Sequence, residues 1–258
     1  MTAGLQVRQL SVRYGGLHAV ADVSLDADVG RITGLIGPNG AGKTTTFNAC
    51  TGLVRPSSGT VSLLGEDVTR LPPQARARRG LGRTFQRMEL FDSLTVLENV
   101  ALGREAGLAG RSPLRHLFAT RSERLEVDAL ARDVLARCGI EDVASRRTAD
   151  LSTGHRRLVE LARAVAGGFR MLLLDEPSSG LDRAETERFG EILTDLVADG
   201  DHGILLVEHD MALVMSVCSD LYVLDFGKLL FKGTPQQVAD SEVVRAAYLG
   251  AEEVESSA

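Results

Sequence analysis

The segment Gly37-Pro38-Asn39-Gly40-Ala41-Gly42-Lys43-Thr44 constrains the chain most, because it fits the phosphate-cradling P-loop pattern G-x-x-x-x-G-K-[ST]. An apolar run, 31–36, precedes it and is predicted to be a buried strand, and 45–50 is predicted to be a helix. In this context backbone N–H groups and the helix N-terminus converge on one anion. We therefore predict a nucleotide site in which Lys43 reaches the terminal phosphates and the Thr44 hydroxyl holds Mg²⁺. The predicted phosphate-binding residues are Gly37, Pro38, Asn39, Gly40, Ala41, Gly42, Lys43, Thr44 and Thr45.

Composition narrows the class of protein. The 258 residues are 44% apolar and 25% charged, which is ordinary for a globular chain with a sizeable core. A net charge of −6 argues against broad nucleic-acid binding, so we expect no nucleic-acid partner.

The cysteines and the apolar segments bear on the compartment. Cys50, Cys138 and Cys218 lie far apart without metal-ligand spacing, which favours a reduced cytosolic chain. The N-terminal residues show no signal-peptide pattern, and no apolar run approaches the ~18 residues of a membrane span. Any role at a membrane is therefore expected to come through a partner.

The order of predicted elements indicates an α/β fold. Residues 5–12 and 19–25 alternate as antiparallel strands do. Two buried-strand runs, 171–174 and 203–207, alternate with helical segments, which implies a parallel sheet covered on both faces. The remaining expectations are a helical insertion over 88–168 with a loop at 103–113, a closing hairpin over 221–233, and a disordered tail over 251–258.

Polar residues follow several of the predicted strands. Ligands of open parallel sheets bind at the carboxyl ends of the strands, where Gln86, Asp175-Glu176 and His209 lie with the P-loop. This set suits phosphoryl transfer to water. Asp175 is the predicted Mg²⁺ partner, Glu176 the general base and His209 a donor to the terminal phosphate.

Each of these residues also has a purely structural interpretation. An acidic pair after a strand is often a loop start, and a lone histidine at a strand end is more often structural. Tyr14 is either an aromatic that stacks on a base or a simple strand-end residue. Glu185 and Glu187 are expected to face solvent on a helix.

Taken together, these motifs resemble the ATP-binding subunits of ABC transporters over nearly the whole chain. The resemblance rests on the P-loop, Gln86, Leu151-Ser152-Thr153-Gly154-His155, Leu174 to Asp182 and His209. It implies one P-loop NTPase (RecA-like) domain over 1–250, with a mixed sheet, an N-terminal antiparallel β subdomain and an inserted helical subdomain. Its core would span 1–87 and 169–233, its helical subdomain 88–168 and its helical end 234–250.

The resemblance also assigns roles to individual residues. Tyr14 would stack on adenine, Gln86 would begin the loop that senses the membrane partner and also serve the metal, and Asp182 would end a dimer-contact loop. Ser152 and Gly154 would contact the γ-phosphate of ATP held by a second ATPase subunit. The segment 151–155 departs from the usual Leu-Ser-Gly-Gly-Gln at Thr153 and His155, which puts the rate of ATP hydrolysis in doubt, not the function.

A narrower resemblance is to the ATPases of branched-chain amino acid importers. It rests on Tyr14-Gly15-Gly16-Leu17, Arg83-Thr84-Phe85-Gln86, the segment 91–100 and the ending Ala247-Tyr248-Leu249-Gly250. It implies ATP and Mg²⁺ as cofactors, with permease subunits and a periplasmic or surface substrate-binding protein as partners. The subunit would then lie on the cytoplasmic face of the membrane.

Other functions stay open at this point. The same group includes ATPases for small amides, urea and lipopolysaccharide export. A soluble ABC ATPase of DNA repair or translation usually has two cassettes or a long coiled coil, and neither appears in the sequence. A GTPase switch needs an N-K-x-D motif, which the positions of the three lysines exclude. A structural subunit with a dead site is disfavoured, because every expected catalytic position is filled.

Overall fold

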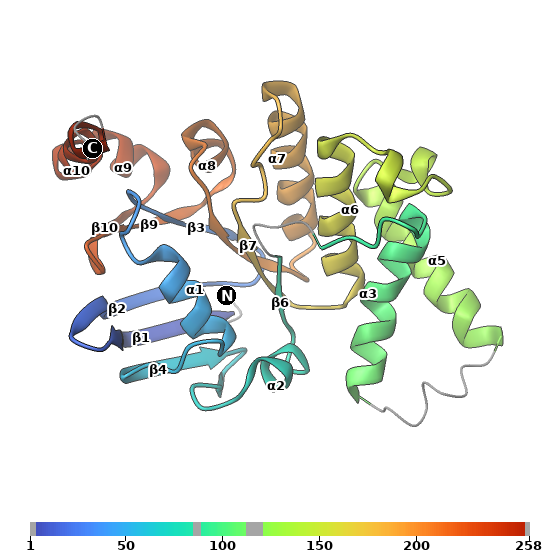
Figure 1. Cartoon of the computed structure of the whole chain (residues 1–258), viewed down its shortest axis with the longest axis horizontal. Helices are drawn as coiled ribbons and strands as arrows, with labels where there is room; N and C mark the ends of the chain where they lie inside the picture. Colours follow the sequence, from blue (N-terminus) through green and yellow to red (C-terminus); the bar gives the residue numbers. More distant parts are fainter. Residues whose placement is uncertain (1–3, 85–88, 112–120, 256–258) are drawn as a thin grey trace.

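A computed structural model describes residues 4–84, 89–111 and 121–255, whose strands form two sheets (Figure 1). The antiparallel sheet has the order β2-β1-β4-β5 and contains β1 (Leu5–Tyr14), β2 (Leu17–Ala27), β4 (Ser58–Leu63) and β5 (Glu66–Asp67). The larger sheet has the order β10-β9-β3-β8-β7-β6. Its strands are β3 (Ile32–Ile36), β6 (Leu81–Arg83), β7 (Met171–Asp175), β8 (Gly203–Val207), β9 (Asp220–Asp225) and β10 (Lys228–Gly233). Five of these run parallel, and β10 pairs antiparallel with β9.

The central strands are buried on both faces, which is why they read as continuous apolar runs. In β3, Ile32 and Ile36 enter one hydrophobic core while Leu35 enters the other. The second core also holds Phe47 of α1 (Lys43–Thr51), so the P-loop helix packs between the two sheets. This arrangement confirms the predicted fold class.

The first core lies between the larger sheet and most of the remaining helices (Figure 1). Helices α3 (Val96–Arg111), α5 (Arg121–Arg137) and α6 (Thr153–Ala166) pack on one another. Helices α7 (Arg183–Ala198) and α8 (Met211–Val217) contribute side chains to the same core. The shorter or terminal elements are α2 (Pro73–Ala77), the 3₁₀ turns η1 (Glu141–Val143) and η2 (Thr148–Asp150), α9 (Pro235–Asp240) and α10 (Glu242–Glu255).

Two boundaries differ from the sequence-based expectation. The expected loop over 103–113 is wrong as far as Arg111, because α3 continues through it. Gly103 acts there as a packing residue, since a Cβ would run into the backbone of Arg163 on α6. The expected disordered tail is helical as far as Glu255. Gln86 lies outside the described residues, as do 256–258. Within the described ranges, no helix combines the length and the apolar character that a membrane crossing needs.

Candidate functional site

The P-loop links the buried strand β3 to helix α1 at the carboxyl end of the sheet. Gly42 caps α1 with a left-handed φ of 96°, a conformation that side-chain-bearing residues rarely adopt. At Gly37 a Cβ would collide with the carbonyl oxygen of Leu224. The loop opens onto a cavity of about 440 Å³, which the other lining residues complete. These are Leu17, His18, Ala19, Thr45, Glu176, His209, Phe226 and Gly227.

Lys43 lies folded back over its own loop. Its Nζ donates to the carbonyl oxygens of Gly37, at 2.6 Å, and Pro38, at 3.0 Å. Burial lowers the pKa of this ammonium, and the nearby carboxylates of Glu176 and Asp175 partly oppose that shift. Because Lys43 donates these two hydrogen bonds to neutral carbonyl oxygens, it is poised to exchange them for an anion.

Glu176 and His209 come together although they follow different strands. Nε2 of His209 lies 2.7 Å from Oε1 of Glu176, a hydrogen bond in which the ring N–H donates to the carboxylate. Glu176 has a left-handed φ of 49°, and its own N–H is held by the carbonyl of Val207 at 2.8 Å. Such backbone strain in a residue other than glycine is typical of functional sites.

Asp175, the predicted Mg²⁺ partner, is the last residue of β7. Its Oδ2 pairs with the guanidinium of Arg83 at 2.8 Å, and both side chains are more than nine-tenths buried. Arg83 also donates to Oδ1 of Asn48 on α1 at 2.7 Å, so one side chain links three elements around the loop. A carboxylate and the Thr44 hydroxyl are hard oxygen donors, which fit Mg²⁺ completed by phosphate oxygens and water.

Sequence reasoning missed two residues that position this site, Arg83 and Glu208. Glu208 is 4% exposed, and its carboxylate accepts the N–H groups of Ser178, at 2.7 Å, and His209, at 3.0 Å. Glu208 therefore fixes both His209 and the start of the loop that leads to Asp182. Its position directly before His209 is a sequence signal that could have pointed to Glu208. The sequence does not show, however, that its carboxylate reaches Ser178, which follows a different strand.

Ser152, Gly154 and Asp182 do not line the P-loop cavity. Ser152 caps α6, and its Oγ accepts the N–H of His155 at 3.3 Å and lies 3.0 Å from the ring Nδ1 of that residue. Asp182 caps α7 in a capping box with Glu185. The expectation that Glu185 simply faces solvent is wrong, because its carboxylate accepts the N–H of Asp182 and lies against Gly154. Glu187 is exposed as expected.

Tyr14 lies outside the residues that line the cavity. It ends β1 opposite Leu17, which does line the cavity, and half of its surface is exposed. Its base-stacking role therefore stays a prediction.

Residues 20–179 match the ABC transporter family. The chain belongs to this family. The relatives named LivG, from Escherichia coli (strain K12), and BraF, from Pseudomonas aeruginosa, are 40% and 39% identical, each covering 95% of the chain and 97% of the relative. Both are described as high-affinity branched-chain amino acid transport ATP-binding proteins.

Further relatives extend the comparison of this ABC ATPase. The lipopolysaccharide export system ATP-binding protein LptB of Haemophilus influenzae is 37% identical over 95% of the chain and 97% of its own length. The crystal structure of MJ1267, an ABC transporter cassette in its ADP conformation, matches with a TM-score of 0.84 at 28% identity. That match covers 97% of the chain and 99% of MJ1267. The chain is thus an ATP-binding and ATP-hydrolysing subunit with the ABC cassette fold.

Proposed function

We propose that this ABC ATPase hydrolyses ATP with Mg²⁺ and so powers the import of branched-chain amino acids or related small amides. The observation that carries the hydrolytic part is the hydrogen bond between Glu176 and His209 at the mouth of the P-loop cavity. It supports Glu176 as the base and His209 as a proton donor for a terminal phosphate and its attacking water. Mg²⁺ held by Thr44, Asp175 and the Gln86 loop would neutralise charge on the phosphates when it is bound.

The residues of the chain have separate parts in this proposal. Lys43 leaves the carbonyls of its own loop and pairs with the terminal phosphates. His209 turns its Nε2–H from Glu176 to the γ-phosphate. The released carboxylate of Glu176 then accepts a proton from water, while Glu208 holds the backbone of His209 in place.

Phosphate release from Mg-ATP tests the hydrolytic part. Glu176→Gln, which keeps the size of the side chain but removes the base, is expected to lower kcat about 10²- to 10⁴-fold while ATP still binds. The kcat of His209→Ala is expected to fall as well. A Glu176→Gln protein with unchanged kcat, or full activity in excess EDTA, would contradict the assignment.

The transported substrate and the partners belong to the proposal as well. The names and identities of LivG and BraF favour amino acid import. The proposed partners are a second ATPase subunit, permease subunits and a periplasmic or surface binding protein. The chain would then act on the cytoplasmic face of the membrane. The LptB match favours lipopolysaccharide export as the second candidate, and a soluble non-transport ATPase is the third. ATP-driven leucine uptake into vesicles that contain this chain together with branched-chain amino acid permease subunits separates these functions.

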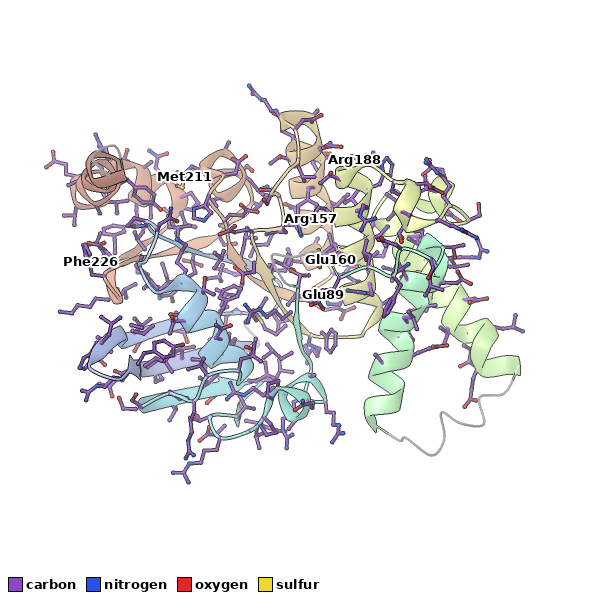
Figure 2. The ribbon with its side chains drawn as sticks, viewed as in Figure 1. Glu89, Arg157, Glu160, Arg188, Met211 and Phe226 are labelled. Carbon is purple, nitrogen blue, oxygen red and sulfur yellow. The ribbon has the colours of Figure 1, made fainter. Side chains whose placement is uncertain are left out.

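A groove lined in part by Thr84 and Glu89 is the proposed permease contact. It has a volume of about 370 Å³, and Phe91, Leu102, Glu160 and Phe169 are among its lining residues. Glu160 of α6 and Glu89, which both line the groove, lie close to each other in Figure 2. Exposed apolar surface of this kind often marks a partner site, and Phe91 is 55% exposed.

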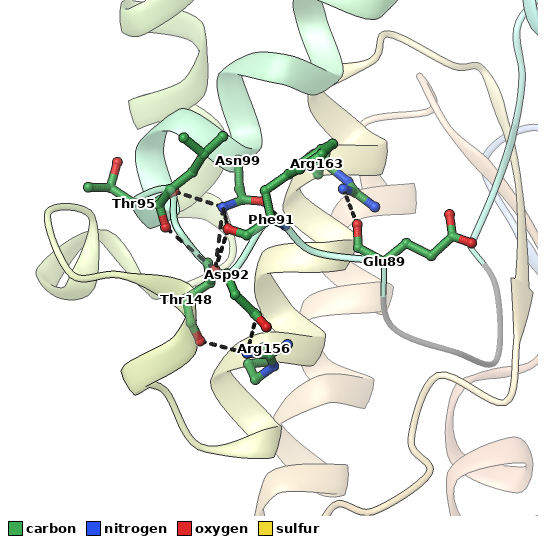
Figure 3. Close-up of polar contacts among 9 residues, drawn as sticks. Glu89, Phe91, Asp92, Thr95, Asn99, Thr148, Arg156 and Arg163 are labelled. Carbon is green, nitrogen blue, oxygen red and sulfur yellow. Dashed lines mark hydrogen bonds and ion pairs between the residues drawn. The ribbon is translucent and has the colours of Figure 1, made fainter.

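The segment that carries Phe91 is fixed to the helical subdomain (Figure 3). Asn99 and Thr148 donate to the carbonyl of Phe91 at 3.1 and 2.9 Å, and Arg156 pairs with Asp92 at 2.8 Å. Arg163 of α6 holds the carbonyl of Glu89. A partner that pushes on this segment would therefore move the helices with it.

Phe91→Asp tests the groove. We expect the variant to lose transport in reconstituted vesicles while its ATP affinity is unchanged, because it adds a charge to the docking surface alone. Leu125→Asp, an equally polar change at a 62% exposed position of α5, is the control and should transport normally. Normal transport by Phe91→Asp would remove the groove from the proposal.

A further inference from the structure

Among the described residues, five other than glycine have a left-handed backbone, and the surroundings of four of them account for it. They are Gln9, Asp22, Leu64, Glu176 and Phe226. The N–H groups of Gln9 and Asp22 bond serine hydroxyls where the β1–β2 pairing is irregular. Glu176 lies in the catalytic site, as described above.

Leu64 and Phe226 occupy equivalent positions in two hairpin turns. Each precedes a glycine in a two-residue hairpin turn, with φ values of 51° and 87° at Leu64-Gly65 and 42° and 76° at Phe226-Gly227. Asn-Gly is the usual choice for such turns, because asparagine tolerates a positive φ. Leu64 packs against the core between the two sheets, which explains its presence. Phe226 is 86% exposed, so packing does not explain the aromatic residue there.

The position of the Phe226 turn is fixed beside the P-loop. The N–H of Gly227 donates to the carbonyl of Ala41 at 3.1 Å, and its carbonyl accepts the N–H of Ala21 on β2 at 2.7 Å. Phe226 therefore lines the same cavity as Lys43 and Thr45, at the end of the β9–β10 hairpin (Figure 2). Leu17 lines that cavity from the β1–β2 hairpin and is 68% exposed.

We propose that Phe226 contacts the nucleoside part of the bound nucleotide and is a binding residue of this site. The polar P-loop takes the phosphates, which leaves the base and sugar to extend toward the rim, where Leu17 and Phe226 supply apolar surface. A base presents a flat apolar face that an aromatic ring covers well and with little preference among bases. An exposed aromatic residue in a strained turn is then explained by ligand contact, as backbone outliers at ligand clamps often are.

This inference rests on ATP binding at the P-loop and is independent of hydrolysis, of the dimer and of the transported substrate. The test is calorimetric titration of the full chain with Mg-ADP and, separately, with inorganic pyrophosphate, for the wild type and for Phe226→Asn. Asparagine suits the turn, so the melting temperature should stay the same or rise. We expect the Kd for ADP to increase roughly 5- to 100-fold, as for loss of one stacking contact, while the Kd for pyrophosphate is unchanged.

Matched variants sharpen the result. Phe226→Tyr keeps the ring and should retain wild-type ADP affinity, whereas Phe226→Leu should lose part of it. Leu64→Asn makes the same change in the equivalent turn, and should lower the melting temperature without affecting ADP binding. An unchanged ADP Kd in Phe226→Asn, or equal losses for ADP and pyrophosphate, would overturn the inference. A wild-type chain that binds neither compound would instead contradict the proposed function.

Discussion

The buried pair of Arg83 and Asp175 gives the most quantitative prediction. Only 9% and 8% of these side chains are exposed, and the pair is 2.8 Å apart. Removing Arg83 leaves the Asp175 carboxylate without its guanidinium partner in a place that water barely reaches, which costs about 3–5 kcal/mol in comparable buried pairs. Arg83→Met also removes the bond to Asn48. We expect this variant to lose about 3–5 kcal/mol of unfolding free energy.

Urea denaturation followed by circular dichroism measures this loss. With an m-value of about 2 kcal/mol/M, the midpoint should fall by roughly 2 M. Arg8→Met is the control, since Arg8 pairs with Asp26 at 2.6 Å but both side chains are well exposed, at 48% and 38%. Such a surface pair is worth at most about 1 kcal/mol. Equal losses in the two variants, or a loss below about 1 kcal/mol for Arg83→Met, would refute the argument that burial determines how much an ion pair contributes to stability.

The remaining predictions concern other parts of the chain. Tyr14→Ala should raise the KM for ATP with little change in kcat, and an unchanged KM would remove Tyr14 from the site. Gly154→Ala should displace Glu185, because the added Cβ meets its carboxylate, and weaken the α7 cap by about 1 kcal/mol in the same urea assay. Burial raises the pKa of the Cys50, Cys138 and Cys218 thiols to about 12 from an ordinary value of 9.0. In the unfolded chain these thiols ionise at a lower pH than in the folded chain. Their contribution to stability should therefore be complete below pH 9.0 and be lost as the pH rises toward about 12. The native protein should accordingly resist a thiol reagent at pH ~8 and react after denaturation.

Much of the site could be predicted from the sequence, because its functional residues directly follow recognisable apolar segments. The P-loop, Asp175-Glu176 and His209 each follow an apolar run, and parallel strands bring their carboxyl ends to one edge. Ser152 and Asp182 act locally too, since each caps the helix that directly follows it.

The unpredicted features depend on contacts between distant segments. Arg83 reaches Asp175 only because β6 and β7 pair in a register that brings Arg83 opposite Leu173, and no pattern along the chain specifies that register. Gly103 was interpreted as a loop residue because its role, close packing of α3 on α6, needs the partner helix. Phe226 gave no signal, since its exposure and strained backbone appear only in the folded chain.

We propose that ATP bound to one subunit is closed by Ser152 and Gly154 of a second subunit. Ser152 caps α6 and does not line the P-loop cavity of its own chain, which favours a contact with a phosphate held by another subunit. The most direct measurement is size-exclusion chromatography with light scattering of Glu176→Gln in Mg-ATP, beside the double variant with Ser152→Glu. We expect the single variant to accumulate as a two-fold dimer, and the double variant to stay monomeric because its carboxylate repels the γ-phosphate. A monomeric Glu176→Gln protein that binds ATP, or a dimeric double variant, would contradict the claim.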